Sequence, residues 1–222
     1  MVIKETLDPW VQAVLCDPLS KTPLRREGDA LVSDYGRSYP IVNGMYDLRL
    51  LTRSRGSLAK RWRSGQDGYE RWSAHAAERP DGEDYARQKQ GVEEVYRAIP
   101  IQGRCLDVGG NDGRLRAFLD PNQEYISIDP YVGIVREERS ENYKRAYPFA
   151  DDPMNFLGAL AEHLPFAAMS FDTVHMRSVV DHFLNPELAM RDAFRVLRGK
   201  GTLIVGLYVT DGEQGALRES AA

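Results

Sequence analysis

Short apolar runs alternate with stretches of helical periodicity along the second half of the chain. Each run is short enough to be a strand that is buried on both faces, and a helical pattern over 186–197 precedes the last one. Strands are predicted at residues 104–108, 124–128, 155–159, 172–176 and 202–208. Strands and helices that alternate in this order favour a parallel sheet with right-handed crossovers. The pattern therefore predicts a doubly wound, mostly parallel α/β core over residues 101–222.

The first 50 residues follow a different pattern. Short apolar stretches at 19–24, 30–32 and 37–46 are separated by turn residues. Stretches of this length, bounded by Gly, Pro, Asn and Ser, are typical of short strands. We therefore expect residues 1–50 to form a small β-rich module in front of the core.

Residues 51–100 are polar and aromatic, and we expect helices that link the two parts. The segment 83–97 has a helical pattern, with three apolar or aromatic residues near one face: Tyr85, Val92, and either Val95 or Tyr96. The resemblance named below implies that such a helix covers a cofactor. Three earlier aromatic residues either pack this segment on the core or form a lid over a substrate: Trp62, Tyr69 and Trp72.

Composition is that of a globular chain, with 222 residues, 42% hydrophobic and 28% charged. The sequence has no apolar run of about 18 residues, and its N-terminus lacks the charged-then-apolar order of a signal peptide. We expect a cytoplasmic protein without a membrane anchor. The two cysteines, Cys16 and Cys105, give no disulfide framework, and Cys105 is predicted to be a small buried hydrophobic residue.

A glycine-rich turn follows the first core strand, in the sequence Arg104-Cys-Leu-Asp-Val-Gly-Gly-Asn-Asp-Gly-Arg114. Glycines allow a tight turn and a close approach of the backbone to a ligand, and a helix that opens near Gly113 would offer unpaired N–H groups. This is where a parallel α/β sheet holds a nucleotide-like cofactor. The dinucleotide pattern G-x-G-x-x-G fails from both Gly109 and Gly110, which argues against NAD.

The turn resembles the acidic-x-Gly-x-Gly-x-Gly motif of class I S-adenosylmethionine-dependent methyltransferases. Asp107, Gly109 and Gly113 match the motif, Gly110 lies within it, and Asn111 stands where the middle glycine usually lies. The departure is mild, because Asn tolerates a positive φ better than most residues. The resemblance implies that these residues bind S-adenosylmethionine, with S-adenosylhomocysteine as product, and that Asp107 faces the methionine amino group.

A second acidic residue, Asp129, follows the strand predicted at 124–128 and stands 22 positions beyond Asp107. A carboxylate at that strand end is placed to accept both ribose hydroxyls. Alone, the pair Asp129-Pro130 would be only a turn. Next to the glycine turn and at this spacing, we favour a role in cofactor binding.

Three more blocks match the same family in order, at 161–166, 170–174 and 195–205, so the resemblance covers about residues 103–210. It is strongest to the widespread small-molecule branch, the type 11 group. There, an Asp that meets the adenine amino group often precedes the Ala-Glu pair, and this chain has Leu160 instead. Adenine would then contact backbone groups around Ala161 and apolar side chains. Glu162, in the same loop, either contacts the cofactor or only caps the loop.

Residues 1–50 resemble the zinc-knuckle module that activates transfer-RNA methyltransferases. The signature of that module ends in an aromatic-Pro-Ile-x-x-Gly turn, here Tyr39-Pro-Ile-Val-Asn-Gly44. Asp17 and Ser20 fall where the first cysteine pair would lie, and the region of the second pair, 32–36, has no Cys or His. Because a tetrahedral zinc site needs four soft or imidazole ligands, we expect this copy to bind no metal.

Methyl transfer from a sulfonium mainly requires alignment of donor and acceptor, and a base only where the acceptor must lose a proton. His182 is the candidate base and Asp181 its candidate orienting group, although neighbouring residues on a helix point apart. The alternative for His182 is packing near the methionine part of the cofactor. Arg177 is a candidate for a cofactor or substrate carboxylate, or for a structural salt bridge.

The family normally ends in a further helix and an antiparallel pair of strands. Twelve residues remain after Thr210, too few for that hairpin. Either the sequence is a truncated product, which we favour, or a partner chain completes the sheet edge, as in a homodimer.

Three functions fit these observations. The first, which we favour, is methyl transfer to an oxygen or nitrogen of a small metabolite, sugar or natural-product intermediate. The second is RNA methylation, suggested by the N-terminal module and the basic run at 53–63 but opposed by a net charge of −4 and a pI near 5.7. The third is a noncatalytic S-adenosylmethionine-binding or partner-activating protein, suggested by Asn111, Leu160 and the short C-terminus. Fold alone does not choose among them.

Overall fold

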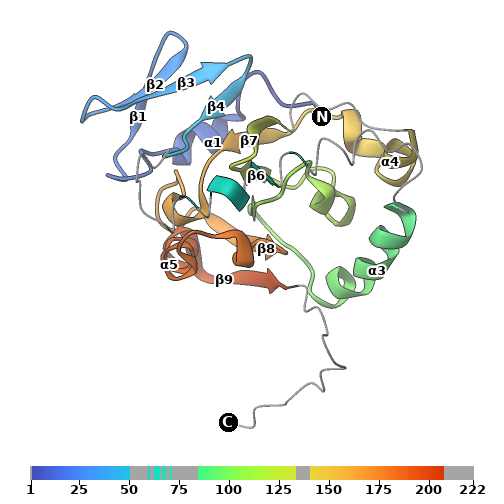
Figure 1. Ribbon diagram of the computed structural model, residues 1–222. Helices are drawn as coiled ribbons and strands as arrows, with labels where there is room; N and C mark the ends of the chain where they lie inside the picture. Colours follow the sequence, from blue (N-terminus) through green and yellow to red (C-terminus); the bar gives the residue numbers. More distant parts are fainter. Residues whose placement is uncertain are drawn as a thin grey trace, which may run out of the picture.

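The computed structural model of the chain describes residues 2–50, 60, 63–65, 67–68, 71, 85–133 and 141–207. In this part of the chain, nine strands form one sheet in the order β1-β2-β3-β4-β7-β6-β5-β8-β9 (Figure 1). The last five strands in this order run parallel to one another. They are β7 (Asn155–Gly158), β6 (Tyr125–Asp129), β5 (Cys105–Val108), β8 (Phe171–Arg177) and β9 (Leu197–Gly206).

The order of the parallel strands is that of a Rossmann-like sheet. From β5 the chain moves outward through β6 and β7, and then returns to the other side of β5 for β8 and β9. The strand order therefore reverses between β5 and β8, which is where such sheets bind ligands, at the carboxyl ends of the strands. The predicted parallel α/β core is confirmed.

Four of the five core strands lie within one residue of their predicted bounds, and β9 differs. It starts at Leu197, directly after helix α5 (Pro186–Val196), because Leu197 already pairs with Phe171 of β8. The prediction placed its start at residue 202, since the intervening Arg-Gly-Lys-Gly looks like a turn. The last predicted residue of this strand, 208, lies outside the described residues.

Side chains alternate between two buried faces of the sheet, with the period of two that strands impose. On one face, Leu106 and Val108 of β5 pack in the same core as Ala189 and Ala193 of α5. On the other, Cys105 packs with residues of η1 (Arg114–Phe118) and of α3 (Tyr85–Ala98). Figure 1 shows α5 and α3 well apart, on either side of the parallel strands. Cys105 is fully buried, as predicted.

The helix after the glycine turn is shorter than expected. Residues 114–118 form one 3₁₀ segment, η1, that ends at Leu119. The chain then meets Asp120-Pro121, and a residue before proline is disfavoured in the helical region. The prediction of a helix opening near Gly113 holds only for a single short segment.

Helix α5 begins at Asn185-Pro-Glu-Leu188. The Asn185 side chain accepts a hydrogen bond from the backbone N–H of Leu188 at 3.1 Å, and Pro186 occupies the first turn. Both are favoured at helix N-termini. The segment 185–188 is therefore a helix start.

Five further helices with bounds in the described residues are short, and all but α1 lie between strands along the chain. They are α1 (Pro9–Val14), α4 (Glu141–Ala146), η3 (Pro148–Asp151), η4 (Ala161–His163) and η5 (Val180–His182). The last two follow β7 and β8 and border the carboxyl edge of the sheet.

The first 50 residues contain four antiparallel strands that continue the core sheet. They are β1 (Leu24–Glu27), β2 (Ala30–Ser33), β3 (Ser38–Val42) and β4 (Met45–Asp47). Tyr46 of β4 pairs in parallel with Leu157 of β7. Three of the four side chains of the outermost strand, β1, are exposed and charged: Arg25, Arg26 and Glu27.

Asp17 organises the loop before β1. Its buried carboxylate accepts the backbone N–H groups of Leu19 and Ser20 at 2.8 and 2.7 Å, and the Arg37 guanidinium at 2.9 and 3.0 Å. The Tyr39 hydroxyl donates to it at 3.0 Å. Although burial raises the pKa of Asp17, these hydrogen bonds outweigh it and hold that pKa well below its usual value. The likeness of this region to a zinc knuckle, and its lack of a metal, stay predictions.

Several predictions fall on parts of the chain outside the described residues. They concern the role of Trp62, Tyr69 and Trp72, most of the basic run at 53–63, and the segment after residue 207. The division of the chain at residues 50 and 100 also stays a prediction.

Candidate active site

The glycine turn has the backbone conformation that its sequence predicts. Gly109 has a φ of 68°, and Asn111 takes a left-handed φ of 48°, which Asn tolerates better than most residues. A Cβ on Gly109 would lie 2.4 Å from Cγ1 of Val179, in the segment that leaves β8. The tips of β5 and β8 therefore touch at a point where only glycine fits.

Asp129 ends β6, and its carboxylate faces the turn. One oxygen accepts the N–H of Tyr131 at 2.7 Å, and the other accepts the N–H of Asn111 at 3.2 Å. Burial, together with the nearby charges of Asp107 and Asp112, outweighs these hydrogen bonds and raises the pKa of Asp129 to about 7. A buried carboxylate in this state is stabilised by added donors, such as a pair of hydroxyl groups.

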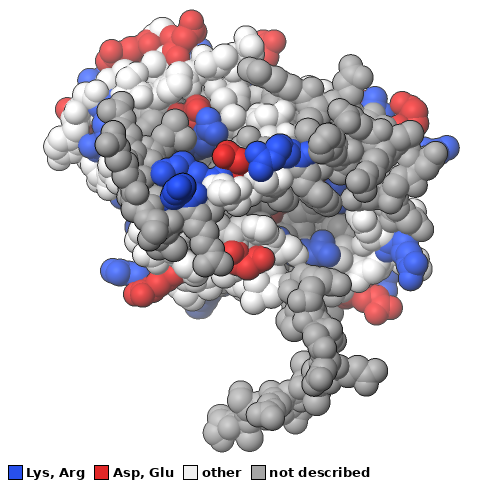
Figure 2. Space-filling view, in the orientation of Figure 1, with Lys and Arg blue, Asp and Glu red and all other residues white. Residues whose placement is uncertain are grey.

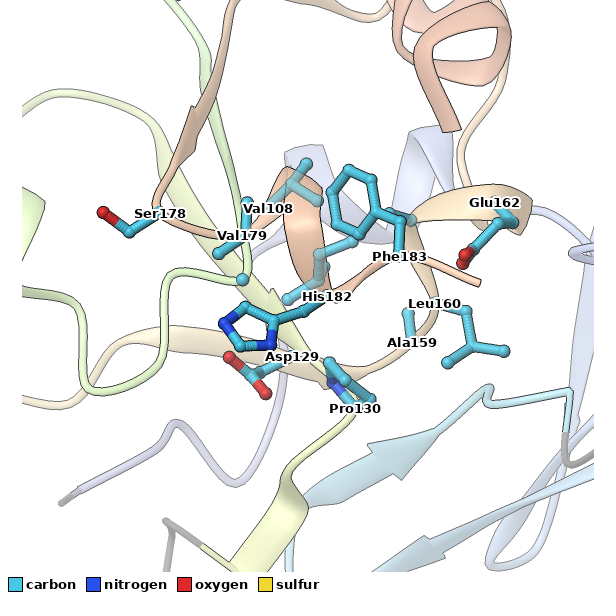
Figure 3. Close-up of a pocket in the computed structure, with 13 residues that line it drawn as sticks. Val108, Asp129, Pro130, Ala159, Leu160, Glu162, Ser178, Val179, His182 and Phe183 are labelled. Carbon is cyan, nitrogen blue, oxygen red and sulfur yellow. The ribbon is translucent and has the colours of Figure 1, made fainter. Parts of the chain in front are cut away.

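A pocket lies over the carboxyl ends of β5, β6 and β7 and the segment after β8 (Figure 3). Seven predicted site residues line it: Gly109, Asp129, Pro130, Leu160, Ala161, Glu162 and His182. In the view of Figure 3, Phe183 and Pro130 stand on opposite sides of the pocket. Its volume is about 80 Å³, below the roughly 300–1,000 Å³ of pockets that enclose a drug-sized ligand. The described residues therefore enclose only part of such a ligand.

Sequence reasoning missed the rest of the lining. Val108, Ile128, Ala159, Val179 and Phe183 are apolar, and Ser178 leads the chain out of β8. Apolar side chains next to a strand end carry no chemical signal that would separate them from the core. Only their position, within two residues of a predicted site residue, could have pointed to them.

Six predicted residues do not line the pocket: Asp107, Gly110, Asn111, Gly113, Arg177 and Asp181. Gly110 and Asp107 are in close contact, because a Cβ on Gly110 would lie 2.4 Å from an Asp107 carboxylate oxygen. The Asp107 side chain therefore packs against the glycine turn and lies outside the pocket. Its predicted contact with the methionine amino group stays a prediction.

Asp107 belongs to a buried chain of hydrogen bonds that the sequence did not suggest. Tyr125 donates its hydroxyl to one carboxylate oxygen at 2.8 Å, and Nδ1 of His175 lies 2.8 Å from the other. Nε2 of His175 lies 2.8 Å from the Tyr96 hydroxyl on α3. A pairing of residues 96, 107 and 175 comes from the sheet register and the docking of α3, which sequence spacing does not reveal.

The loop after β7 carries both an apolar and a polar lining residue. Leu160 is nearly buried, and Glu162 accepts the N–H groups of Leu184 and Asn185 at 2.7 and 3.1 Å with one carboxylate oxygen. Glu162 therefore ties this loop to the start of α5. This is the capping role that was one of its two predicted alternatives.

His182 reaches the pocket from η5, and its side chain is about half exposed. Nε2 of His182 lies 3.8 Å from an Asp181 carboxylate oxygen, a distance too long for a hydrogen bond. Asp181 is itself 70% exposed. The geometry brings His182 to the site and leaves Asp181 outside it.

The described part of the chain has no candidate metal site. No group of three or more His, Cys, Asp or Glu side chains there could hold a metal ion. Both cysteines are buried, and burial raises the pKa of Cys16 to about 11. In the same described part, no helix is both long and apolar enough to cross a membrane.

A family profile described as "Methyltransferase domain" matches residues 106–205, a range that begins in β5 and ends in β9. We refer to residues 106–205, which match this family, as the methyltransferase domain. S-adenosylmethionine is the cofactor of such domains, in agreement with the motif that follows β5. The buried Asp129 carboxylate suits the ribose hydroxyls of this cofactor. The glycine turn suits a close approach of the protein backbone to it.

Two curated proteins are similar to the methyltransferase domain and its surroundings. The uncharacterized protein MJ1123 of Methanocaldococcus jannaschii is 30% identical over 131 residues, which cover 59% of this chain and 57% of that protein. A mitochondrial 2-methoxy-6-polyprenyl-1,4-benzoquinol methylase of Caenorhabditis elegans is 27% identical over 112 residues, covering 48% and 38%. This chain therefore spans about half the length of the curated relatives it matches.

Two solved structures are similar to part of the chain. The PH0226 protein of Pyrococcus horikoshii is 19% identical and has a TM-score of 0.46, with 56% of this chain and 55% of that chain covered. YcgJ of Bacillus subtilis is 24% identical, with a TM-score of 0.42 and coverage of 54% and 50%.

Proposed function

We propose that the protein transfers a methyl group from S-adenosylmethionine to an oxygen or nitrogen of a small molecule. The observation that carries this proposal is the buried Asp129 carboxylate beside the glycine turn, within the methyltransferase domain. The nematode relative, named as a benzoquinol methylase, supports a small acceptor. The metabolite, sugar or natural-product class of the acceptor is part of the proposal.

The residues of the pocket would bind and orient the two reactants. S-adenosylmethionine supplies a methyl group on a sulfonium, so alignment matters more than activation. The Asp129 carboxylate would hold the ribose hydroxyls, and the apolar Pro130 and Leu160 would pack on the adenine. His182 would take a proton from an acceptor, without an orienting hydrogen bond to Asp181.

Surface charge favours a small acceptor over nucleic acid. The chain has a net charge of −4, and Figure 2 shows basic and acidic side chains mixed on one face of the molecule. Neither feature supports the broad basic surface that phosphate backbones require. We therefore propose a protein that acts without a nucleic-acid partner or a membrane, in the cytoplasm.

Calorimetric binding of S-adenosylmethionine and S-adenosylhomocysteine tests the proposal. Asp129→Asn removes the charge but keeps the size of the side chain, and we expect it to weaken binding about tenfold to a hundredfold. That range follows from the ~1.5–3 kcal/mol of hydrogen bonds to a charged group. Asp29→Asn, in an exposed turn between β1 and β2, is the matched control and should bind like the wild type.

The outcomes separate the three functions. Cofactor binding that is lost in Asp129→Asn, with turnover of a small acceptor, would support the proposal. Binding without turnover on any acceptor would favour a noncatalytic role, and salt-sensitive binding of transfer RNA would favour the RNA enzyme. If neither cofactor binds the wild type, the proposal is wrong.

A further inference from the structure

Arg177 stands at the carboxyl edge of the sheet, next to the cofactor pocket but outside it. It is the last residue of β8 and is exposed, and the two residues that follow it line the pocket. Gly206 of β9 is its partner in the sheet, and a Cβ there would lie 3.2 Å from Cγ of Arg177. The stem of Arg177 therefore lies against bare backbone.

A buried chain of side chains leads from the sheet to the Arg177 head group. The exposed fractions of Asp107, His175 and Tyr96 are 3%, 4% and 8%, and 2.8 Å separates each neighbouring pair of polar atoms. An ionised Asp107 only accepts, so Nδ1 of His175 carries the proton in this pair. Nε2 of a neutral His175 then accepts the Tyr96 hydroxyl hydrogen, which leaves the Tyr96 oxygen as an acceptor.

Arg177 lies at the outer end of this chain, two residues beyond His175 on β8 and therefore on the same face of the sheet. Burial raises the pKa of Tyr96 to about 12, whereas the positive charge of Arg177 lowers it. The guanidinium therefore lies beside the Tyr96 oxygen. Among the described residues, no carboxylate lies within the 4.0 Å of an ion pair with Arg177. A guanidinium has five N–H donors, so most of them stay available to a ligand.

We propose that Arg177 binds a carboxylate of the methyl acceptor, and that Tyr96, His175 and Asp107 hold its guanidinium in position. A planar guanidinium matches a carboxylate in a two-bond arrangement, better than any other cationic side chain. This inference rests on the proposed methyltransferase function and names its substrate class as carboxylate-bearing small molecules. Tyr96, His175 and Asp107 act through Arg177 and are positioning residues.

The position of Arg177 favours the acceptor over the cofactor as the source of the carboxylate. Arg177 does not line the pocket that contains Asp129, and its side chain lies with Tyr96 and His175 on the face of the sheet that α3 covers. A carboxylate held there would place the rest of the acceptor next to the strand tips of β5 and β8.

Carboxylates of increasing size, each paired with its amide, provide the first test. Acetate with acetamide and benzoate with benzamide are titrated by NMR into protein saturated with S-adenosylhomocysteine. We expect the wild type to bind at least one acid about tenfold or more tightly than its amide. Arg177→Gln should lose this preference, and Arg177→Lys should recover it only in part. Arg191→Gln, at an exposed position on α5, is the matched control and should keep it.

Tyr96→Phe tests the positioning role. Removal of the hydroxyl oxygen near Arg177 should reduce the acid-to-amide ratio severalfold while leaving affinity for S-adenosylhomocysteine unchanged. If Tyr96 had only a structural role, the variant would unfold at lower denaturant concentration with an unchanged ratio. That outcome would contradict the positioning role, and equal binding of every acid and amide to the wild type would overturn the carboxylate site.

A last comparison separates the two sources of a carboxylate. S-adenosylhomocysteine has an amino-acid carboxylate, and 5′-methylthioadenosine lacks it. If Arg177→Gln weakens binding of the first and not of the second, then Arg177 binds the cofactor and the acceptor assignment is wrong. If the wild type binds neither nucleoside, the methyltransferase proposal itself fails. This result is distinct from the one in which Arg177→Gln binds both nucleosides as the wild type does.

Discussion

The Asp129 carboxyl group titrates near neutral pH, and this sets how cofactor affinity depends on pH. Burial raises its pKa to about 7, so the free protein carries a proton there at lower pH. A carboxylate that accepts two hydroxyl hydrogens must lose this proton. Affinity for S-adenosylhomocysteine should therefore fall about tenfold per pH unit below 7 and level off above it. Calorimetry between about pH 5.5 and 8.5, in buffers of different ionisation enthalpy, measures both the affinity and the proton released.

His182 provides the control for this dependence, because histidine also titrates in this range and His182 lines the same pocket. Asp129→Asn should bind weakly and with little change over the range. His182→Gln should keep the wild-type profile. The reverse pattern, a flat profile in His182→Gln, would assign the dependence to the histidine.

Single residues were predictable where one residue type has a specific conformational or chemical property. Asn111 in place of a motif glycine predicted a positive φ, and Asp129 at a strand end predicted a buried carboxylate in the pocket. Asp107 was equally well placed in the sequence, yet its carboxylate is bonded to Tyr125 and His175. Those partners come from neighbouring strands, and no spacing along the chain encodes which side chains meet across a sheet.

At the scale of elements, the contact between the tips of β5 and β8 leads to a prediction for Gly109→Ala. The added methyl group would clash with Val179, and alanine is strained at a φ of 68°. We expect cofactor affinity to fall about tenfold to a hundredfold, as ~1–3 kcal/mol of strain implies. Calorimetry with S-adenosylhomocysteine measures the loss.

Two further variants separate the causes of that loss. Gly199→Ala, where an added Cβ meets nothing within 4 Å, should bind normally. Adding Val179→Ala to Gly109→Ala removes the clash but not the backbone strain, and should restore affinity in part. If Gly109→Ala binds as well as the wild type, the two strand tips are not a fixed part of the pocket.

The strands were predictable as elements because short apolar runs buried on both faces differ clearly from helical patterns. The ends of the strands were less predictable. Helix α5 passes into β9 at Leu197 without a connecting loop, and the Gly-Lys-Gly that follows looks like a turn in sequence although it continues the strand. The short η1 is followed by Asp120-Pro121, whereas the pattern predicted only that a helix opens near Gly113.

For the whole molecule, the continuous sheet predicts a single unfolding transition. Leu31 and Tyr39 of the first strands share a core with Leu106 and Val174 of the methyltransferase domain. Asp17→Asn weakens the hydrogen bonds that the buried carboxylate accepts and should lower the free energy of unfolding by about 1.5–3 kcal/mol. Urea unfolding followed by far-UV circular dichroism and tryptophan fluorescence should show both signals shifting together.

Asp34→Asn serves as the control, since its ion pair with Arg25 is exposed on both sides and should contribute about 1 kcal/mol or less. Two separate transitions in Asp17→Asn, with cofactor binding kept after the first, would mean that residues 1–50 are an independent unit. That result would support the predicted boundary at residue 50 over the continuity of the core.

The charged outer strand β1 has a consequence for how the protein behaves at high concentration. All four residues of β7 are buried. Without its β4 partner, this strand would present unpaired N–H and C=O groups at an apolar edge of the sheet. Such unpaired edge strands can pair with strands of other molecules. With the four antiparallel strands in place, the edge strand is β1. Its exposed charged side chains, Arg25, Arg26 and Glu27, disfavour pairing with another strand. The first 50 residues thus protect the methyltransferase core from aggregation along this edge.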